Sequence, residues 1–261
     1  MLCSLCGARP ASTADGRCAM CTGFHREGER VRPVPVPAGL YHLRSPVALG
    51  RVVCVLLGSV AVADALSIAS GVHARLLLGD RTEDGYATVD DLTWTHAEAL
   101  YQSTGALQGL TLLATAVVFL IWLRRVRRNA EVFDPGAHSM RPGWAIGAWF
   151  VPIGNLWLPY RVVRDVRTAS ELPGTPGGRS AFPGVLLHAW WVALVAAQLF
   201  GRYASRRYEA AETLDEITDA LDLVAFSDVL DIVAAVLAVL LVRGLTAMQG
   251  ERATLGPLAV G

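Results

Sequence analysis

Four cysteines near the start of the chain have the spacing that binds a metal ion. They form two Cys-x-x-Cys pairs, Cys3 with Cys6 and Cys18 with Cys21, separated by eleven residues. Two such pairs can present four thiolates tetrahedrally to one Zn²⁺, and the bound metal stabilises a segment too short to form a hydrophobic core. We therefore predict a structural zinc ribbon, rich in β-structure, over residues 1–24. A redox dithiol or a small iron–sulfur site would use the same thiolates, and both alternatives stay open.

Aspartates within apolar stretches are the second group that could do chemistry. Asp64 lies in an apolar run at about 47–69, and Asp231 lies in another at about 225–242. Ionisable side chains inside a membrane are costly and often mark a proton or cation site, so Asp64 and Asp231 are candidates for such a site. The alternative is that these carboxylates and Asp228 pair with nearby arginines, namely Arg202, Arg206 and Arg207.

An aromatic, proline-containing segment at 144–160 is the third candidate. It is as apolar as a transmembrane segment, but proline removes a backbone donor and clashes with the preceding turn. A helix over 144–151 is therefore expected to break near Pro152, and Asn155 is expected to cap a second helix over 156–165. The candidate functional residues here are Trp144, Trp149, Pro152, Asn155, Trp157, Pro159, Arg161, Arg164 and Asp165.

The elements that position these residues are predicted to be transmembrane helices. The chain is 53% hydrophobic and its mean hydropathy is +0.40, which is typical of a multipass membrane protein rather than a soluble domain. Four apolar runs reach, or nearly reach, the length that crosses a bilayer as a helix. We predict spans at about 47–69, 104–123, 184–201 and 225–242.

The distribution of arginines predicts the orientation of these spans. The formal net charge is zero, so we expect no nucleic-acid partner. Six arginines lie in residues 1–46, five in 124–141 and four in 161–183, whereas acids outnumber arginines in 70–103 and 202–228. The positive-inside rule places the arginine-rich stretches, and with them both termini, in the cytoplasm.

The same charge pattern determines how the 144–160 segment relates to the membrane. Both of its flanks are arginine-rich, so both are expected on the cytoplasmic side, and we interpret the segment as re-entrant or interfacial. A kinked fifth span is the alternative, and it would bring the acidic 202–228 stretch inside. An inert interfacial helix with its aromatic rings at headgroup depth is a further alternative.

The predicted fold is an all-α membrane protein: a four-span helical bundle with one re-entrant or interfacial broken helix, preceded by the small zinc ribbon. We also predict a helix over 206–224 that continues into the last span, from its apolar residues at helical spacing. The predicted domains are a cytoplasmic zinc-ribbon module at 1–24, a Pro/Arg linker at 25–46, a membrane domain at 47–248 and a cytoplasmic tail at 249–261.

The run from Arg141 to Ser170 reads RPGWAIGAWFVPIGNLWLPYRVVRDVRTAS. It resembles the signature of a family of actinobacterial membrane proteins called domain-of-unknown-function family 4328 (DUF4328). The likeness extends from about Pro46 to Met248. Members often carry a short cysteine ribbon ahead of the membrane part, so the resemblance implies this architecture and an actinobacterial origin, but no activity or substrate.

A non-enzymatic membrane adaptor or regulator is the leading functional hypothesis. A closed metal site joined to a membrane bundle would bind a protein partner at the cytoplasmic face, through the ribbon or the 141–170 surface; a homo-oligomer is left open. The alternative is a small ion or solute channel or transporter in which the broken helix lines the path, with Asp64, Asn155 and Asp231 as its polar residues. An intramembrane lipid enzyme would need a convergent nucleophile and base, and the sequence offers no such pair.

Overall fold

The computed structural model of the chain describes residues 2–4, 11–12, 18, 43–83, 91–172 and 183–255. The chain divides into two compact units, Met1–His42 and Leu43–Gly261. Most of the predicted zinc ribbon and of the predicted linker lies outside the described residues. The second unit is helical in nearly all of the part that the structure describes.

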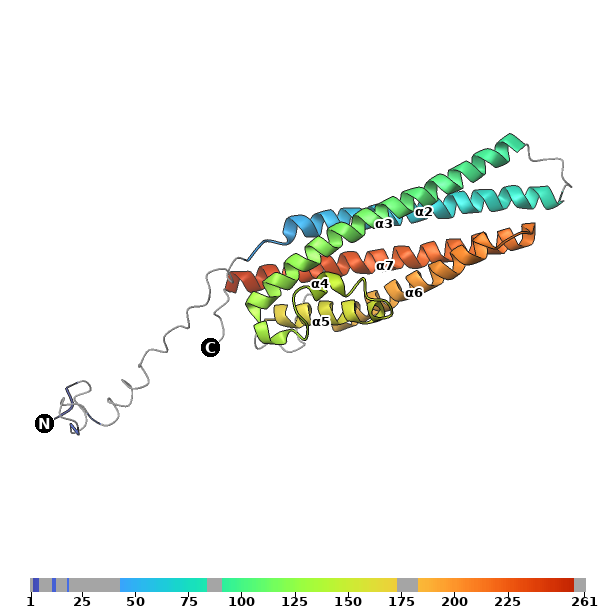
Figure 1. The fold of residues 1–261 in the computed structure, drawn as a ribbon. Helices are drawn as coiled ribbons and strands as arrows, with labels where there is room; N and C mark the ends of the chain where they lie inside the picture. The colour runs from blue at the N-terminus through green and yellow to red at the C-terminus, as the bar shows by residue number, and fades with distance from the viewer. Residues whose placement is uncertain are drawn as a thin grey trace. The chain divides into compact units, whose positions relative to one another are not determined.

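Four long helices make up most of the second unit: α2 (Val47–Glu83), α3 (Asp91–Phe133), α6 (Gly184–Glu209) and α7 (Leu214–Leu255) (Figure 1). Each is long and apolar enough to cross a membrane, which confirms the prediction of four membrane-length helices. The helices are longer than the predicted spans. α3 has 43 residues. At about 1.5 Å per residue it measures about 65 Å, so it extends well beyond a hydrocarbon core about 30 Å thick.

The predicted helix over 206–224 is interrupted, because α6 ends at Glu209 and α7 begins at Leu214. From Leu214 on, the helix continues into the last span as predicted. The carboxylate of Glu216 accepts a hydrogen bond from the backbone amide of Thr213 at 3.1 Å, and the Thr213 hydroxyl accepts one from the amide of Glu216 at 3.3 Å. This reciprocal pair is a capping box, which satisfies amides at a helix start. It begins a new helix at this position.

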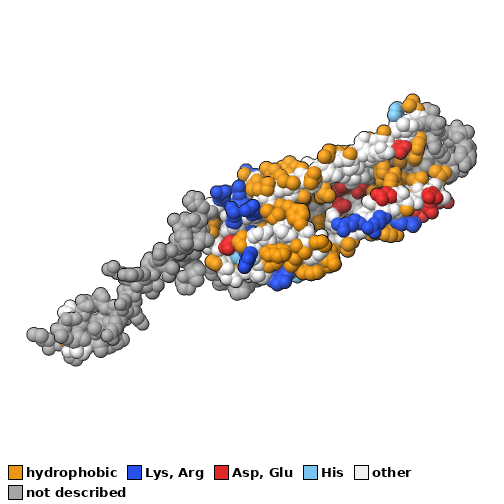
Figure 2. Space-filling view, viewed as in Figure 1, with side chains coloured by type: hydrophobic (Ala, Val, Ile, Leu, Met, Phe, Trp, Pro, Cys, Tyr) orange, Lys and Arg blue, Asp and Glu red, His pale blue; other side chains and the backbone are white. Residues whose placement is uncertain are grey.

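The four helices pack as an open row with α2 and α7 at its centre. α2 packs along α3 on one side and along α7 on the other, and α6 packs along α7. The main core lies where α2, α3 and α7 meet and extends to α5 and α6. Its fully buried side chains include Val53, Trp122, Leu123, Val126, Val163, Val166, Leu187, Leu241 and Leu245. Many other large apolar side chains are exposed around the helices, and Figure 2 shows them over the middle of the unit. Such helices suit a lipid environment.

The two ends of this unit differ in charge (Figure 2). We call the end where α3 finishes and α6 begins the basic end, because it carries the five arginines of residues 124–141. The opposite end, where α2 finishes and α7 begins, is called the acidic end. Residues 134–172, which connect α3 to the stretch before α6, lie at the basic end (Figure 1), and we call them the basic-end module.

The basic-end module contains η1 (Pro135–Ala137), α4 (Trp144–Gly147), η2 (Gly154–Leu156) and α5 (Leu158–Ser170). The 144–160 segment is therefore not one continuous helix, and its first half is a single helical turn, shorter than the predicted helix over 144–151. The predicted cap by Asn155 is wrong: Asn155 lies in η2, and α5 starts without a side-chain cap. Backbone bonds close the turn instead, including one from the Trp157 amide to the Gly154 carbonyl at 3.1 Å.

Candidate functional site

In the first unit, the structure brings one cysteine of each pair together. Cys3 and Cys18 are both buried, and the backbone amide of Cys18 donates a hydrogen bond to the sulfur of Cys3 at 3.3 Å. Cys6 and Cys21 lie outside the described residues. Amide hydrogen bonds to sulfur stabilise the negative charge of a thiolate ligand, so this contact fits the donor set of a Cys₄ zinc site.

In the second unit, Gln108 joins two buried aspartates from different helices. Its side-chain amide nitrogen donates a hydrogen bond to Oδ1 of Asp64 on α2 and another to Oδ1 of Asp228 on α7, each at 2.9 Å. The aspartates are 3% and 5% exposed, respectively. The second oxygen of each carboxylate, Oδ2, is buried without a hydrogen-bond partner. Asp231, half-buried on α7, lies within electrostatic range of both carboxylates.

The structure does not pair these aspartates with arginines. Among the residues that it describes, no arginine nitrogen lies within 4.0 Å of Asp64, Asp228 or Asp231, and the ion pair towards the acidic end joins Arg75 to Asp222 at 3.0 Å instead. The expected pairing with Arg202, Arg206 and Arg207 is therefore wrong. Those arginines lie on exposed positions of α6.

Gln108 is the residue that sequence reasoning missed. It is the one strongly polar amide within the apolar run at 104–123, and Thr104 lies one helical turn before it. That spacing puts both side chains on one face of a helix and could have indicated a polar face turned towards Asp64. Together, Asp64, Gln108, Asp228 and Asp231 are called the carboxylate cluster below.

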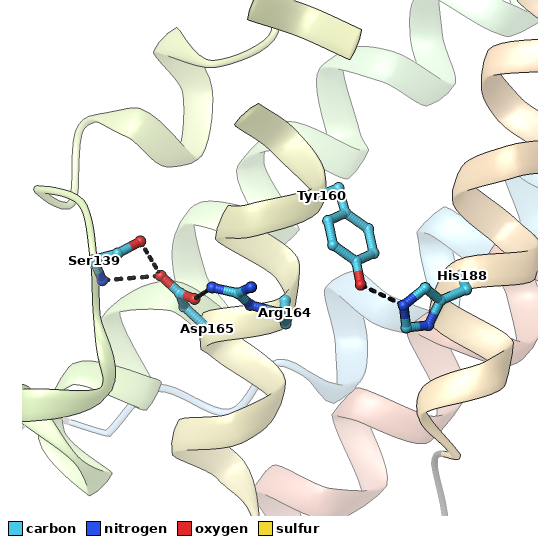
Figure 3. A network of polar contacts seen from close by, with 5 residues as sticks. All are labelled: Ser139, Tyr160, Arg164, Asp165 and His188. Carbon is cyan, nitrogen blue, oxygen red and sulfur yellow. Dashed lines mark hydrogen bonds and ion pairs between the residues drawn. The ribbon is translucent and has the colours of Figure 1, made fainter. Parts of the chain in front are cut away.

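At the basic end, Asp165 fixes the start of the module to α5 (Figure 3). Its Oδ2 accepts hydrogen bonds from the backbone amide of Ser139 at 2.9 Å and from the Ser139 hydroxyl at 2.5 Å, and its Oδ1 accepts one from Arg164 at 3.2 Å. Burial raises the pKa of Asp165, but the hydrogen bonds from Ser139 and Arg164 outweigh it, so its pKa lies below the ordinary value. Asp165 is thus a charged, buried anchor rather than a surface residue.

A buried arginine holds the same stretch from the side of α3. The guanidinium of Arg127 donates a hydrogen bond to the Met140 carbonyl at 3.0 Å and lies 3.5 Å from the carboxylate of Glu131. Burial lowers the pKa of His138, and the nearby Arg127 charge lowers it further. The imidazole is therefore held in its neutral form near neutral pH.

Polar side chains of α7 fasten both ends of the module to the bundle. Arg252 donates hydrogen bonds to the Phe133 carbonyl at the end of α3 and to the Glu171 carbonyl just after α5. Gln249, fully buried, donates to the Val126 carbonyl at 2.8 Å and to the Ser170 hydroxyl at 3.2 Å. The chain therefore enters and leaves the module at the same end of the bundle.

A hydrogen bond between Tyr160 and His188 joins α5 to α6 (Figure 3). Nδ1 of His188 lies 2.8 Å from the Gly184 carbonyl, which can only accept, so Nδ1 carries the proton. Nε2 therefore accepts the hydrogen bond from the Tyr160 hydroxyl, at 2.8 Å. Trp191 adds a hydrogen bond from its ring nitrogen to the Leu156 carbonyl at 3.0 Å. This histidine has a structural role.

The predicted residues of the 144–160 segment and its exit divide into buried and exposed groups. Trp149 packs edge-on against Phe119 and Trp191, with ring centroids 5.7 and 6.1 Å apart, and Asp165 and Pro159 are buried. Asn155 is partly buried. The exposed group comprises Trp144, Pro152, Trp157, Arg161 and Arg164, and with them Phe150 and Ile153, which sequence reasoning missed and which are 72% and 73% exposed.

Comparison with protein families gives a match that covers residues 86–247, to the family described as Domain of unknown function (DUF4328). The chain belongs to the DUF4328 family. The DUF4328 region contains α3, the basic-end module, α6 and most of α7, so Gln108 and Asp165 lie within it. It begins later than the expected likeness from about Pro46, so Asp64 precedes it. Comparisons with curated proteins and with solved structures gave no match.

Proposed function

We propose that this DUF4328 protein is a non-enzymatic adaptor or regulator of the cell membrane that binds a protein partner at its basic end. The observation that carries the proposal is the basic-end module. It is tied to α3 through Arg127, to α6 through Tyr160 and to α7 through Arg252, and within it Asp165 joins Ser139 to α5. These buried contacts hold the exposed surface of the module in one conformation. A partner can then bind with little loss of conformational entropy in the module, which favours a stable docking site.

The orientation of this surface follows from the charges around it. The positive-inside rule puts the basic end, and with it both termini, in the cytoplasm. The 144–160 segment is then re-entrant or interfacial, with the exposed side chains of Phe150, Ile153 and Trp157 in the inner leaflet. Arg161 and Arg164, both exposed, lie in the first half of α5 and face headgroups or the partner. The fastening of both ends of the module by Arg252 supports this interpretation over a fifth span.

A structural zinc ribbon completes the proposed architecture. Cys3, Cys6, Cys18 and Cys21 would hold one Zn²⁺, and the contact between the Cys18 amide and the Cys3 sulfur supports this donor set. The metal would supply the folding energy of residues 1–24 and no chemistry of its own. The run at 141–170 supports an actinobacterial origin. Purified protein should contain one equivalent of zinc, and the double change Cys3→Ser, Cys18→Ser should abolish it.

Labelling of single cysteines, in a variant with the native cysteines replaced, tests the topology first. Pro135→Cys and Thr168→Cys flank the 144–160 segment, and Asp215→Cys marks the acidic end. In intact cells an impermeant thiol reagent should label only position 215, and positions 135 and 168 should react after permeabilisation. Labelling of 135 and 168 from opposite sides would contradict the proposal.

Site-specific photo-crosslinking tests the partner surface. A photoreactive residue at position 161 or 164 should give a crosslinked protein partner in cells, and the same residue at position 206, on the other end of the bundle, serves as the matched control. Arg161→Glu should weaken the crosslink from position 164, as should removal of residues 1–38 if the ribbon takes part. An identical crosslinking pattern from positions 164 and 206 would argue against a docking surface here.

Ion or solute transport is a second candidate function, favoured by the carboxylate cluster. The pathway would differ from the one expected from sequence, because Asn155 belongs to η2 in the basic-end module, whereas Asp64 and Asp228 bond to Gln108 on α3. Liposomes that contain the wild-type protein should then show a flux that Asp64→Asn and Asp228→Asn abolish. Equal flux in protein-free liposomes, or no effect of either change, would remove this candidate.

A further inference from the structure

The carboxylate cluster lies at one level within the hydrocarbon-spanning part of the bundle. The midpoints of the predicted spans of α2, α3 and α7 are near residues 58, 114 and 234, and Asp64, Gln108 and Asp228 each lie about six residues from these midpoints towards the acidic end. Six residues of helix measure about 9 Å, which is less than the half-thickness of about 15 Å of the hydrocarbon core. The cluster is thus predicted to lie below the headgroups.

Three ionised carboxylates cannot remain unneutralised at this depth. Charged groups in hydrocarbon are strongly disfavoured unless a counter charge and hydrogen bonds compensate for the loss of water. No arginine among the described residues forms an ion pair with the three aspartates, and Gln108 is neutral. The titratable neighbour on α3 is Tyr101, which lies within electrostatic range of Asp228. On α6 it is Tyr208, whose ring centroid is 5.5 Å from that of Tyr101.

Gln108 satisfies only one of the two oxygens of each carboxylate that it bridges. A primary amide has two N–H donors, and here one goes to Oδ1 of Asp64 and the other to Oδ1 of Asp228. Both Oδ2 atoms stay buried without a hydrogen-bond partner. Because both bridged oxygens lie 2.9 Å from the same nitrogen, the two carboxylates are held close to each other. Their negative charges therefore repel, and the unpartnered oxygens require a positive ligand.

The donor geometry distinguishes between a metal ion and a proton. Within the part of the chain that the structure describes, no group of three His, Cys, Asp or Glu side chains converges as metal ligands do. A proton needs only one oxygen and then supplies an O–H donor for an acceptor nearby. We propose that Asp64, Asp228 and Asp231, with Gln108 as the bridge, form a proton-binding site. Hydronium transfers a proton to a carboxylate oxygen, an O–H bond forms, and water leaves.

Hydroxyl groups lead from the cluster towards the acidic end. Ser67 lies beside Asp228, and the hydroxyls of Ser70 and Thr104 lie 3.1 Å apart between α2 and α3. All three side chains are buried. The hydroxyls of Ser70 and Thr104 also contact the backbone carbonyls of Ser67 and Tyr101, at 2.9 and 2.8 Å, so buried polar contacts continue about one helical turn from the cluster towards the acidic end. Further out, the exposed ion pair of Arg75 with Asp222 lies on the same two helices, α2 and α7.

Infrared spectroscopy of the full-length protein in lipid vesicles tests the proposal. At pH 7 the wild type should show the C=O stretch of a protonated carboxylic acid, and Asp64→Asn and Asp228→Asn should each reduce it. Asp219→Asn, an exposed carboxylate on α7, is the matched control and should leave the band unchanged. If a buried variant fails to fold, Asp231→Asn at the half-buried position replaces it. The proposal would be overturned if the wild type lacked the band, or if the band were unchanged in every folded variant of Asp64, Asp228 and Asp231.

Thermal unfolding gives a second, independent measurement. As pH rises, the Tm of the wild type should fall over the same range in which the infrared band disappears, because the folded state binds a proton that the unfolded chain has released. Each such proton changes the folding equilibrium constant about tenfold per pH unit. Asp64→Asn should flatten this dependence. A Tm that is constant over that range, or that responds to sodium but not to choline at fixed pH, would overturn the proton site in favour of no ligand or a metal ion.

Discussion

Replacement of Asp165 by alanine should loosen the first part of the basic-end module, around Ser139, from α5. Asp165 is 6% exposed and accepts two hydrogen bonds from Ser139, one from the backbone amide and one from the hydroxyl. Asp165→Ala leaves both Ser139 donors without their acceptor and removes the partner of Arg164. Hydrogen bonds to a charged group contribute about 1.5–3 kcal/mol each. Because water reaches Ser139 once the carboxylate is gone, we expect a total loss of about 3 kcal/mol.

Hydrogen exchange measured by mass spectrometry can locate this loss. Where exchange reports the opening equilibrium, about 3 kcal/mol corresponds to roughly hundredfold faster exchange. The increase should be confined to peptides from residues 134–172, with α2 and the acidic end of α7 unchanged. Asp222→Ala is the matched control, because its ion pair with Arg75 is about half exposed and such pairs contribute less than about 1 kcal/mol. Exchange in 134–172 that rises less than threefold would refute the anchoring role.

The same anchor predicts a pH dependence. The pKa of Asp165 lies below its ordinary value, so the folded module favours the charged form. Its contribution is complete above the unfolded pKa of about 3.9 and is lost as pH falls through the lower pKa of the folded state. After correction for intrinsic exchange rates, opening of residues 134–172 should therefore increase below about pH 4 in the wild type. Asp165→Ala should show little of this increase.

Three further changes test the module. Ile153 has a φ of 61°, which is strained for a β-branched residue. Ile153→Gly should thus stabilise the turn by about 1 kcal/mol in thermal unfolding, and a lower Tm would contradict that reading. Gly154→Ala would place a Cβ 2.8 and 2.9 Å from neighbouring side chains, and should destabilise by about 1–3 kcal/mol in the same assay; an unchanged Tm would show that the turn can adjust. Arg252→Met removes the donors to the Phe133 and Glu171 carbonyls. Faster hydrogen exchange is expected at both ends of residues 134–172. Faster exchange at one end alone would show that only one of the two hydrogen bonds stabilises the module.

The break in the aromatic segment could be predicted, but its closure could not. Pro152 lacks a backbone donor whatever surrounds it, so a helix through this position is disfavoured by local chemistry alone. Asn155 was expected to cap the next helix because asparagine does so frequently. In the structure the turn closes through backbone bonds around Gly154, where an added Cβ would lie only 2.8 Å from the side chain of Leu158. This closure by backbone bonds depends on how the side chains of Leu158 and Val151 pack against Gly154.

For the buried aspartates, too, the sequence indicated the residues but not their partners. Asp64 and Asp231 were recognisable as costly groups within apolar runs, because burial of charge in a membrane can be read from one segment. Their expected pairing with arginines of α6 was wrong. Gln108 is the actual partner of Asp64 and Asp228, which are 44 and 120 residues away from it in sequence. Only the rotation of α2, α3 and α7 about their axes brings these side chains together.

By itself, the sequence determined the four apolar helices, the arginine-rich end and the site of the break, because span length, charge distribution and the missing donor of proline are properties of short stretches of chain. The tertiary structure alone decided that Asp165 is a buried anchor while Arg161 and Arg164 remain exposed. It also decided that Gln108 bridges two carboxylates. Helical periodicity specifies which side chains share a face, whereas the neighbour of that face depends on how separate helices pack against one another.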